Sequence, residues 1–315
     1  MGNGTANEKT RAPRNRTLSV DSSDAERLGP CVIDSASLAQ GSLPRNSLIH
    51  GDAFEVLPRL QPDSVDLLFA DPPYNLNKSF GKQAFRSRAS ADYEEWLDSW
   101  LSICAPLLKP TASVYICGDW RSGGAIERAG TKYFTLRNRI TWEREKGRGA
   151  KTNWKNAAED IWFFTVSSRY TFNLDAVKHR RRVVAPYRTN GIPKDWNETP
   201  GGNFRDTHPS NLWTDITVPF WSMPENTDHP TQKPEKLMAK LILASTGPGD
   251  LVLDPFAGSG TTAVVCKKLA RDFIAVESDR DHCLAAAKRL ELAAADDTIQ
   301  GFSDGVFWER NSAKR

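Results

Sequence analysis

The sequence contains few cysteines, and their spacing gives no sign of pairing. The five cysteines are widely separated along 315 residues and include no C-x-x-C pair. Such a pattern is typical of reduced thiols and argues against a disulfide framework and against a zinc site. We therefore expect an intracellular protein without a bound metal.

Long apolar runs are also missing. No stretch approaches the roughly 18 consecutive apolar residues that a membrane-spanning helix needs. The polar start of the chain lacks the apolar core of a secretory signal peptide. These absences predict a cytoplasmic protein that makes no contact with a membrane.

A strong excess of one charge is absent as well. The net charge at pH 7 is only +3, which neither requires nor excludes a polyanionic partner. The distribution of charge is then more informative than its sum. Basic residues are concentrated in the ranges 78–88, 146–155 and 178–182.

Apolar patterns divide the chain into three parts. Residues 1–43 are expected to form a disordered polar tail, 44–294 one α/β domain, and 295–315 a C-terminal tail. Within the domain, strands are expected at 46–50, 65–70, 113–117, 139–142, 160–164, 251–253 and 273–277, and helices at 53–60, 91–108, 235–245, 261–269 and 282–294. Strands that alternate with helices predict a doubly wound, mostly parallel sheet. Residues 170–228 show no persistent helix or strand period, which indicates an insertion outside the sheet.

A glycine-rich loop follows one of the predicted strands. Gly258 and Gly260 allow positive φ and a close approach of a ligand to the backbone. Asp254, at the strand end, is placed to hold a positively charged or amino-bearing group. Glu277, at the end of the next strand, suits a ribose diol. Because no Gly-Lys-Ser/Thr follows, the loop is not a P-loop; it predicts a nucleoside-bearing cofactor but does not identify it.

The second motif, Asp71-Pro72-Pro73-Tyr74, directly follows the buried strand 65–70. The two prolines fix φ and remove two amide donors, so that carbonyls stay free to accept hydrogen bonds. The loop offers a carboxylate, a rigid carbonyl and an aromatic ring, a set that fits a planar exocyclic amine. Acceptors outside the ring plane would favour a tetrahedral nitrogen and stabilise the positive charge that develops during methyl transfer. A simple proline-capped strand end is the structural alternative.

Together these residues resemble a known family. The Asp71 motif resembles the catalytic D/N/S-P-P-Y motif of DNA amino-methyltransferases, and Phe256-Ala257-Gly258-Ser259-Gly260 resembles their cofactor motif F-x-G-x-G. The catalytic motif comes first, which resembles the permuted beta group of restriction–modification systems and solitary bacterial enzymes. His229-Pro230-Thr231-Gln232-Lys233-Pro234 and Gly51-Asp52 also match, and the resemblance covers roughly residues 46–292.

The resemblance implies a fold and a cofactor. We expect the Rossmann-like fold of S-adenosylmethionine-dependent methyltransferases, circularly permuted, with a seven-stranded sheet and target recognition by 170–228. The implied catalytic residues are Asp71, Pro72, Pro73 and Tyr74, and the implied cofactor-binding residues are Asp52, Asp254, Phe256, Gly258, Gly260, Thr261, Glu277, His229 and Lys233. Two of these have alternatives: Lys233 as a solvated cation ahead of a surface helix, and Asp52 as the cap of the helix at 53–60.

The implied substrate is adenine N6 in double-stranded DNA. A base inside a duplex must be flipped out to reach such a pocket, and phosphate contacts must come from basic residues. The candidates for DNA contacts are Lys78, Lys82, Arg86, Arg88, Arg148, Lys151, Arg180, Arg181 and Arg188; for base contacts they are Arg188, Asn190, Lys194, Asn197, Asn203 and Arg205. Solvated charged faces are the alternative. A homodimer and a cognate restriction endonuclease are further partners that the resemblance allows.

Related reactions remain as alternatives. Cytosine N4 presents the same chemistry, but Ser in place of Asp71 is the family's usual N4 signature, so Asp71 favours adenine. A cytosine C5 enzyme would need a Pro-Cys nucleophile after a strand, and the only Pro-Cys, Pro30-Cys31, lies in the predicted tail. RNA and protein-glutamine methyltransferases use N-P-P-Y loops, but the permuted order and the basic insertion argue against them. The remote alternative is a DNA-binding protein with a non-catalytic methyltransferase fold.

Overall fold

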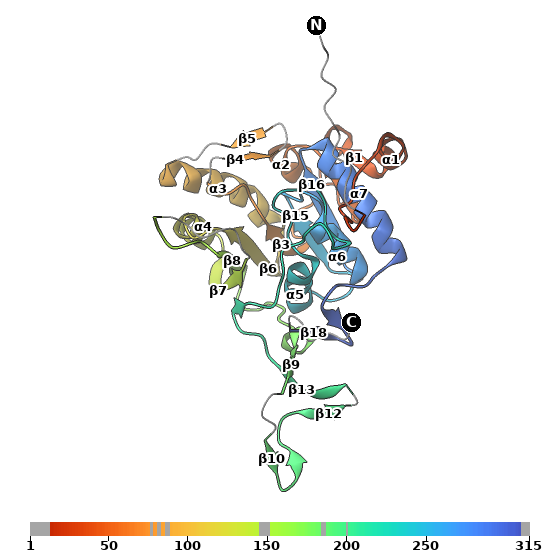
Figure 1. The fold of residues 1–315 in the computed structure, drawn as a ribbon. Helices are drawn as coiled ribbons and strands as arrows, with labels where there is room; N and C mark the ends of the chain where they lie inside the picture. Colours follow the sequence, from red (N-terminus) through yellow and green to blue (C-terminus); the bar gives the residue numbers. More distant parts are fainter. Residues whose placement is uncertain are drawn as a thin grey trace.

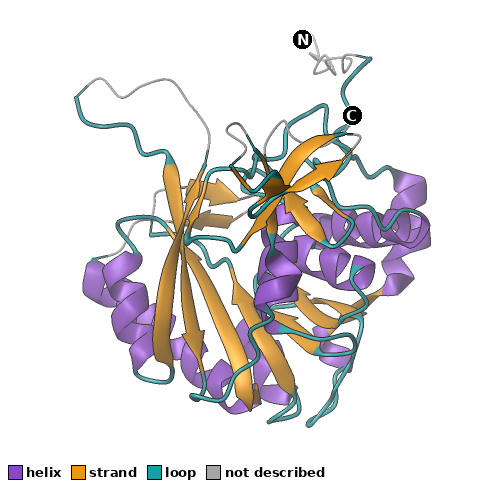
Figure 2. Cartoon of the chain, turned by 90° about the horizontal axis from the view of Figure 1, so that it is seen from below, coloured by secondary structure: helices purple, strands orange, loops and turns teal. Residues whose placement is uncertain are grey.

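The computed structural model describes residues 13–75, 78–80, 83–85, 89–144, 152–183, 187–199 and 201–309. A large sheet runs through the middle of the molecule, with helices on both of its faces (Figures 1 and 2). None of the helices in these ranges is long and apolar enough to cross a membrane.

The large sheet has nine strands, and all but one run in the same direction. In spatial order they are β1 (Val32–Asp34), β2 (Ser47–His50), β16 (Asp272–Glu277), β15 (Leu251–Asp254), β3 (Val65–Ala70), β6 (Leu108–Gly118), β8 (Ala158–Thr165), β7 (Thr135–Glu143) and β14 (Leu212–Trp213). Only β8 is antiparallel to its neighbours. The mostly parallel sheet is thus as predicted, but the expected strand number of seven is wrong because the short strands β1 and β14 extend its two edges.

Two helical layers cover the sheet. On one face lie α2 (Ala53–Val56), α3 (Ser90–Cys104) and α4 (Gly123–Thr131); on the other lie α1 (Ser22–Leu28), α5 (Glu235–Ser245), α6 (Thr261–Lys268) and α7 (Arg280–Ala295). Along β3, Leu67 and Phe69 pack in one layer, whereas Leu68 and Ala70 pack in the other. The continuous apolar run of this strand therefore reflects burial on both faces.

The helix predicted at 235–245 is present as α5, but it is buried on all sides, whereas the alternative considered for Lys233 takes it as a surface helix. Its Lys236 and Lys240 both form ion pairs with Asp215, and Glu235 pairs with Arg289. Lys236 also donates a hydrogen bond to the backbone carbonyl of Trp308, which lies in β18 near the C-terminal end of the described residues. Because these remote segments cover the polar face of α5, its sequence pattern alone could not reveal the burial.

The terminal segments are folded where the structure describes them, so the predicted tails are wrong there. From residue 13 on, the N-terminal segment forms α1 and β1; Asp21 and Asp24 make a capping box on α1, and Asp24 pairs with Lys288 of α7. At the other end, β17 (Phe302–Ser303) and β18 (Val306–Trp308) follow α7. These segments gain their order from contacts with distant parts of the chain, which no local period shows.

The insertion 170–228 contains strands despite its irregular sequence. Three of them, β9 (His179–Arg182), β12 (Asn197–Thr199) and β13 (Gly202–Thr207), join β17 and β18 in a second, five-stranded sheet. The hairpin of β10 (Arg188–Thr189) and β11 (Ile192–Pro193) extends from this sheet at the bottom of Figure 1. Another hairpin pairs β4 (Lys78–Phe80) with β5 (Gln83–Phe85). The strands within 170–228 are short, and β10 and β12 are exposed, which explains why this part of the sequence shows little apolar alternation.

Candidate active site

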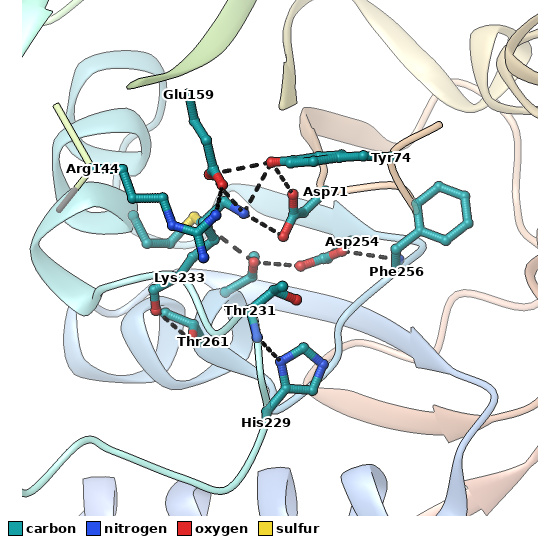
Figure 3. A network of polar contacts seen from close by, with 12 residues as sticks. Asp71, Tyr74, Arg144, Glu159, His229, Thr231, Lys233, Asp254, Phe256 and Thr261 are labelled. Atoms are coloured by element: carbon teal, nitrogen blue, oxygen red, sulfur yellow. Dashed lines mark hydrogen bonds and ion pairs between the residues drawn. The ribbon is translucent and has the colours of Figure 1, made fainter. Parts of the chain in front are cut away.

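A cavity of about 290 Å³ opens at the carboxyl ends of the parallel strands. This edge is where ligands bind in open α/β sheets. All four predicted catalytic residues line the cavity, together with the predicted cofactor residues Asp52, His229, Lys233, Asp254, Phe256, Gly258, Thr261 and Glu277. Gly260 belongs to the same glycine loop, although it does not line the cavity itself. The two motifs therefore meet in one site, part of which is shown in Figure 3.

The glycine loop needs its glycines for two reasons. Gly258 and Gly260 have φ values of +53° and +74°, in the left-handed region that side chains disfavour. A Cβ atom on Gly258 would also lie 2.9 Å from Nε2 of His229, and one on Gly260 would lie 2.5 Å from Cβ of Ala286. The loop thus allows α6 to begin directly beneath the cavity and to pack closely on α7.

Asp254 is buried at the end of β15. Its carboxylate accepts hydrogen bonds from the backbone N–H of Phe256, at 3.0 Å, and from the Thr262 hydroxyl. Burial raises the pKa of Asp254 to about 7, against the effect of these two donors. Such a carboxylate would gain most from an amino or cationic group in the cavity.

Two further acids combine a local backbone contact with a place in the cavity wall. Asp52 caps α2 by accepting from the Phe54 N–H at 2.8 Å, so the capping alternative is correct, and yet it lines the cavity. Glu277 accepts from the Gly258 N–H at 2.7 Å and holds the glycine loop. Through its hydrogen bond and charge, Glu277 also raises the pKa of His282.

The catalytic loop is held by tyrosines. The Tyr74 hydroxyl donates to Oδ1 of Asp71 at 3.0 Å, and the Tyr93 hydroxyl of α3 donates to the Pro73 carbonyl at 3.1 Å. Burial and the neighbouring carboxylates raise the pKa of Tyr74 well above its usual value, so it remains a neutral phenol. Burial, more than any other cause, raises the pKa of Asp71.

Lys233 reaches the catalytic carboxylate. Its Nζ lies 2.6 Å from Oδ2 of Asp71 and 3.2 Å from the Tyr74 oxygen. The residue is only 6% exposed, which rules out the solvated-cation alternative. Although burial opposes it, the charges of Asp71 and Glu159 raise the pKa of Lys233, so it stays protonated.

Glu159 and Arg144 complete the polar network, and the sequence prediction missed both. Oε2 of Glu159 lies 3.3 Å from the Tyr74 oxygen and 3.4 Å from Nζ of Lys233, and its other oxygen accepts from Arg144 (Figure 3). Burial works against ionisation, but the two cations lower the pKa of Glu159. Because β8 runs antiparallel, its first residues lie at the edge where the other strands end. The available signal was a pair of acids, Glu159 and Asp160, at the start of an otherwise mostly apolar strand.

Of the predicted DNA-contact residues, the structure describes the side chains of Arg180, Arg181 and Arg188, and these three do not line the cavity. Lys82, Arg86, Arg88, Arg148, Lys151 and the side chain of Lys78 lie outside the described residues. Each of the other three contacts an acid: Arg180 forms two 2.7 Å hydrogen bonds with Asp206, Arg181 pairs with Glu309, and Arg188 pairs with Glu198. In the described part of the chain these arginines therefore act within the second sheet and its hairpin.

Sequence comparison shows clear relatives. A family model described as DNA methylase (N6_N4_Mtase) matches residues 65–288. The DNA adenine methyltransferase YhdJ of Escherichia coli K12 is 36% identical over 257 residues, which cover 79% of this chain and 83% of YhdJ. The type II methyltransferase M.HpaI of Haemophilus parainfluenzae is 34% identical, with 78% of this chain and 74% of M.HpaI covered.

Solved structures share the fold. M1.HpyAVI superposes with a TM-score of 0.52 at 25% identity, covering 76% of this chain and 96% of that protein. Its complex with S-adenosylmethionine gives 0.50 at 26% identity, with coverages of 76% and 97%. The cytosine-N4-specific PvuII DNA methyltransferase gives 0.59 at 20% identity, with coverages of 82% and 92%, which supports the fold alone. The expected S-adenosylmethionine-dependent DNA methylase is confirmed, and the chain belongs to the N6/N4 DNA methylase family.

Proposed function

We propose that this DNA methylase transfers a methyl group to N6 of adenine in duplex DNA. The observation that carries the proposal is the meeting of the Asp71–Tyr74 loop and the Asp254–Gly260 loop in one cavity. The first suits an exocyclic amine and the second a nucleoside-bearing cofactor. The name of the relative YhdJ, an adenine methyltransferase, supports adenine as the base.

The cavity fits S-adenosylmethionine. The cofactor, when bound, supplies a methyl group carried by a positively charged sulfur. Asp254 would hold its amino group, because ionisation of this buried carboxyl needs a nearby positive charge. Glu277 would accept from the ribose hydroxyls, and Asp52 and Phe256 would border the adenine ring. Lys233, by its distance from Asp71, belongs to the catalytic end of the cavity.

At the catalytic end, Asp71 and the Pro72 carbonyl would accept the two hydrogens of the target amine. Both acceptors are held rigidly, so their alignment need not be established during the reaction. Tyr74 would stack on the flipped base. The proton that leaves the methylated nitrogen would pass to Asp71, whose pKa is raised by burial and therefore suits proton acceptance.

The arrangement along the chain also enters the proposal. The catalytic loop precedes the cofactor loop, which agrees with a circularly permuted, beta-group order around a core of seven of the nine strands. The second sheet and the rest of 170–228 would recognise the target sequence. The basic ranges 78–88 and 146–155 would contact phosphates. A homodimer and a cognate endonuclease remain predictions.

The test is to express the protein in a host without adenine methylation and to sequence the host DNA for modified bases. N6-methyladenine at one recurring motif is expected, and the Asp71→Ala variant serves as the matched negative control. N4-methylcytosine instead would replace the proposed base. Unmodified DNA from cells with folded protein, together with an inactive purified protein, would refute the proposed function.

A further inference from the structure

The catalytic carboxylate already has a donor on each of its oxygens. Oδ1 of Asp71 accepts from Tyr74, and Oδ2 accepts from Lys233. Each carboxylate oxygen can accept a second hydrogen bond, but a target amine that binds Asp71 competes with these two donors, one of them a cation at 2.6 Å. A buried donor that loses its acceptor is costly, most of all when it is a cation.

Glu159 offers both donors a second acceptor. Its Oε2 lies 3.3 Å from the Tyr74 oxygen and 3.4 Å from Nζ of Lys233, so each donor needs only a small movement. Tyr74 has a single hydrogen and can donate to either Asp71 or Glu159. The two carboxylates thus flank the same phenol and the same ammonium (Figure 3).

Arg144 fixes the position of this second acceptor. It pairs with Oε1 of Glu159, which leaves Oε2 directed toward Lys233 and Tyr74. Together the two carboxylates and two cations balance in charge, so the network as a whole can be buried. If Lys233 moves from Asp71 to Glu159, the balance is kept while Asp71 becomes free.

We propose that Glu159 is a positioning residue that takes over Lys233 and the Tyr74 hydroxyl when the target amine binds Asp71. The inference rests on the proposed function, since it assumes that an amine binds Asp71. It assigns Glu159 a task that a merely structural ion pair would not have: Glu159 frees the catalytic acceptor without leaving a buried cation alone.

Glu159→Gln keeps the size of the side chain and removes its charge. Lys233 then has Asp71 as its one anionic partner in the network, so the amine competes for Asp71 against a stronger ion pair. We expect the single-turnover rate at saturating cofactor to fall about 100-fold, the typical effect of losing one preorganised charge contact. Cofactor affinity should stay within a few-fold of wild type.

The pH profile gives a second readout. The groups that face Asp71 are Lys233, Tyr74, Glu159, Tyr93, Cys117 and Asp254. Among them Glu159 is an anion that raises the pKa of Asp71. Its removal should lower that pKa and move the acid limb of the single-turnover rate to lower pH, whereas loss of packing alone would leave the limb in place.

The experiment compares wild type, Glu159→Gln and the control Asp160→Asn on the duplex identified by sequencing. Asp160 is the adjacent acid on β8; it bonds to Thr141 and does not line the cavity. A third readout needs no turnover: affinity for the duplex with adenine, compared with one whose target is 2-aminopurine, which lacks the 6-amino group. Glu159→Gln should lose the preference for adenine, and Asp160→Asn should keep it.

If Glu159→Gln does not fold, Arg144→Gln replaces it, because Arg144 is partly exposed and its loss only loosens Glu159. A smaller rate loss and a smaller loss of preference are then expected. The inference is overturned, and the proposed function is kept, if the wild type is active and the variant, Glu159→Gln or Arg144→Gln, has the same single-turnover rate, the same acid limb and the same preference for the adenine duplex. A wild type without any transfer overturns the proposed function and the inference with it.

Discussion

The cavity and the five-stranded sheet both contain ion pairs, but the two sets differ in whether the cation can change its carboxylate partner. In the cavity, Lys233 lies between two carboxylates, Asp71 and Glu159, so the contact can shift from one to the other. In the second sheet, Arg180 and Asp206 hold each other through two hydrogen bonds across neighbouring strands. A cation between two carboxylates, such as Lys233, can change partner during a reaction. A cation that is bound to a single carboxylate, such as Arg180, mainly holds two strands together. Runs of arginine such as 180–182 are therefore weak indicators of phosphate contacts by themselves.

The strongest test of this contrast is Asp71→Ala. It removes the acceptor for the amine, and we expect methyl transfer to fall by at least about 10³-fold, at the upper end for one preorganised contact. Cofactor affinity should change only a few-fold, because the proposed cofactor contacts come from Asp254, Glu277 and Asp52 and not from Asp71. Radiolabelled methyl transfer and calorimetric cofactor titration measure the two effects. Turnover at the wild-type rate would exclude Asp71 from the mechanism.

Gly260→Val should eliminate cofactor binding and lower stability by about 2–4 kcal/mol, since it combines left-handed strain with a clash against Ala286. Gly191, in the turn between β10 and β11, also has a positive φ of +80°, but a Cβ atom on it would meet no heavy atom within 4 Å. Gly191→Val is thus the matched control and should carry the strain alone, about 1–2 kcal/mol. Thermal unfolding and cofactor titration distinguish the two. A Gly260→Val protein that still binds the cofactor would contradict the assignment of the loop.

The pH dependence of cofactor binding is the next smaller effect. The pKa of Asp254 is raised to about 7, so the carboxyl becomes neutral as the pH falls through that value and loses its attraction for an amino group. Affinity should drop up to about tenfold per pH unit below 7. For the free protein the sign is opposite: a raised carboxyl pKa favours folding at low pH, and this contribution is lost as pH rises through 7. Asp254→Asn should remove both dependences; a titration with the same slope in that variant would assign it to another group.

Arg180→Ala should have the smallest effect on catalysis. We expect a stability loss of about 1 kcal/mol from the lost hydrogen bonds and a methyl-transfer rate within a few-fold of wild type. The hydrogen bond from Arg180 lowers the pKa of Asp206, so its contribution to stability is present above about pH 4 and disappears as pH falls below it. Chemical denaturation at pH 7 and pH 3 checks this. A large loss of DNA affinity with a reduced salt dependence would show instead that Arg180 contacts phosphate.

The two regions also differ in how far the sequence could predict them. Asp71 and Asp254 each end a strand with a recognisable apolar run, so their place at one sheet edge followed from the geometry of parallel strands. Glu159 reached the same edge only because β8 runs antiparallel, a direction that its sequence does not encode. In the second sheet, short strands pair residues from the insertion with residues near the end of the chain, and no local period predicts such pairing.

The sequence by itself predicted seven strands of the large sheet, five of the helices that cover it, the two motifs and the family, because the periods of strands and helices and the conformational needs of proline and glycine are local properties. Tertiary structure alone decided which charges share the cavity. Lys233, Glu159 and Arg144 come from separate segments, and burial makes each dependent on the others for a partner. It also decided that α5 is covered on every side and that the described parts of both termini are ordered, since the groups that satisfy them lie far away along the chain.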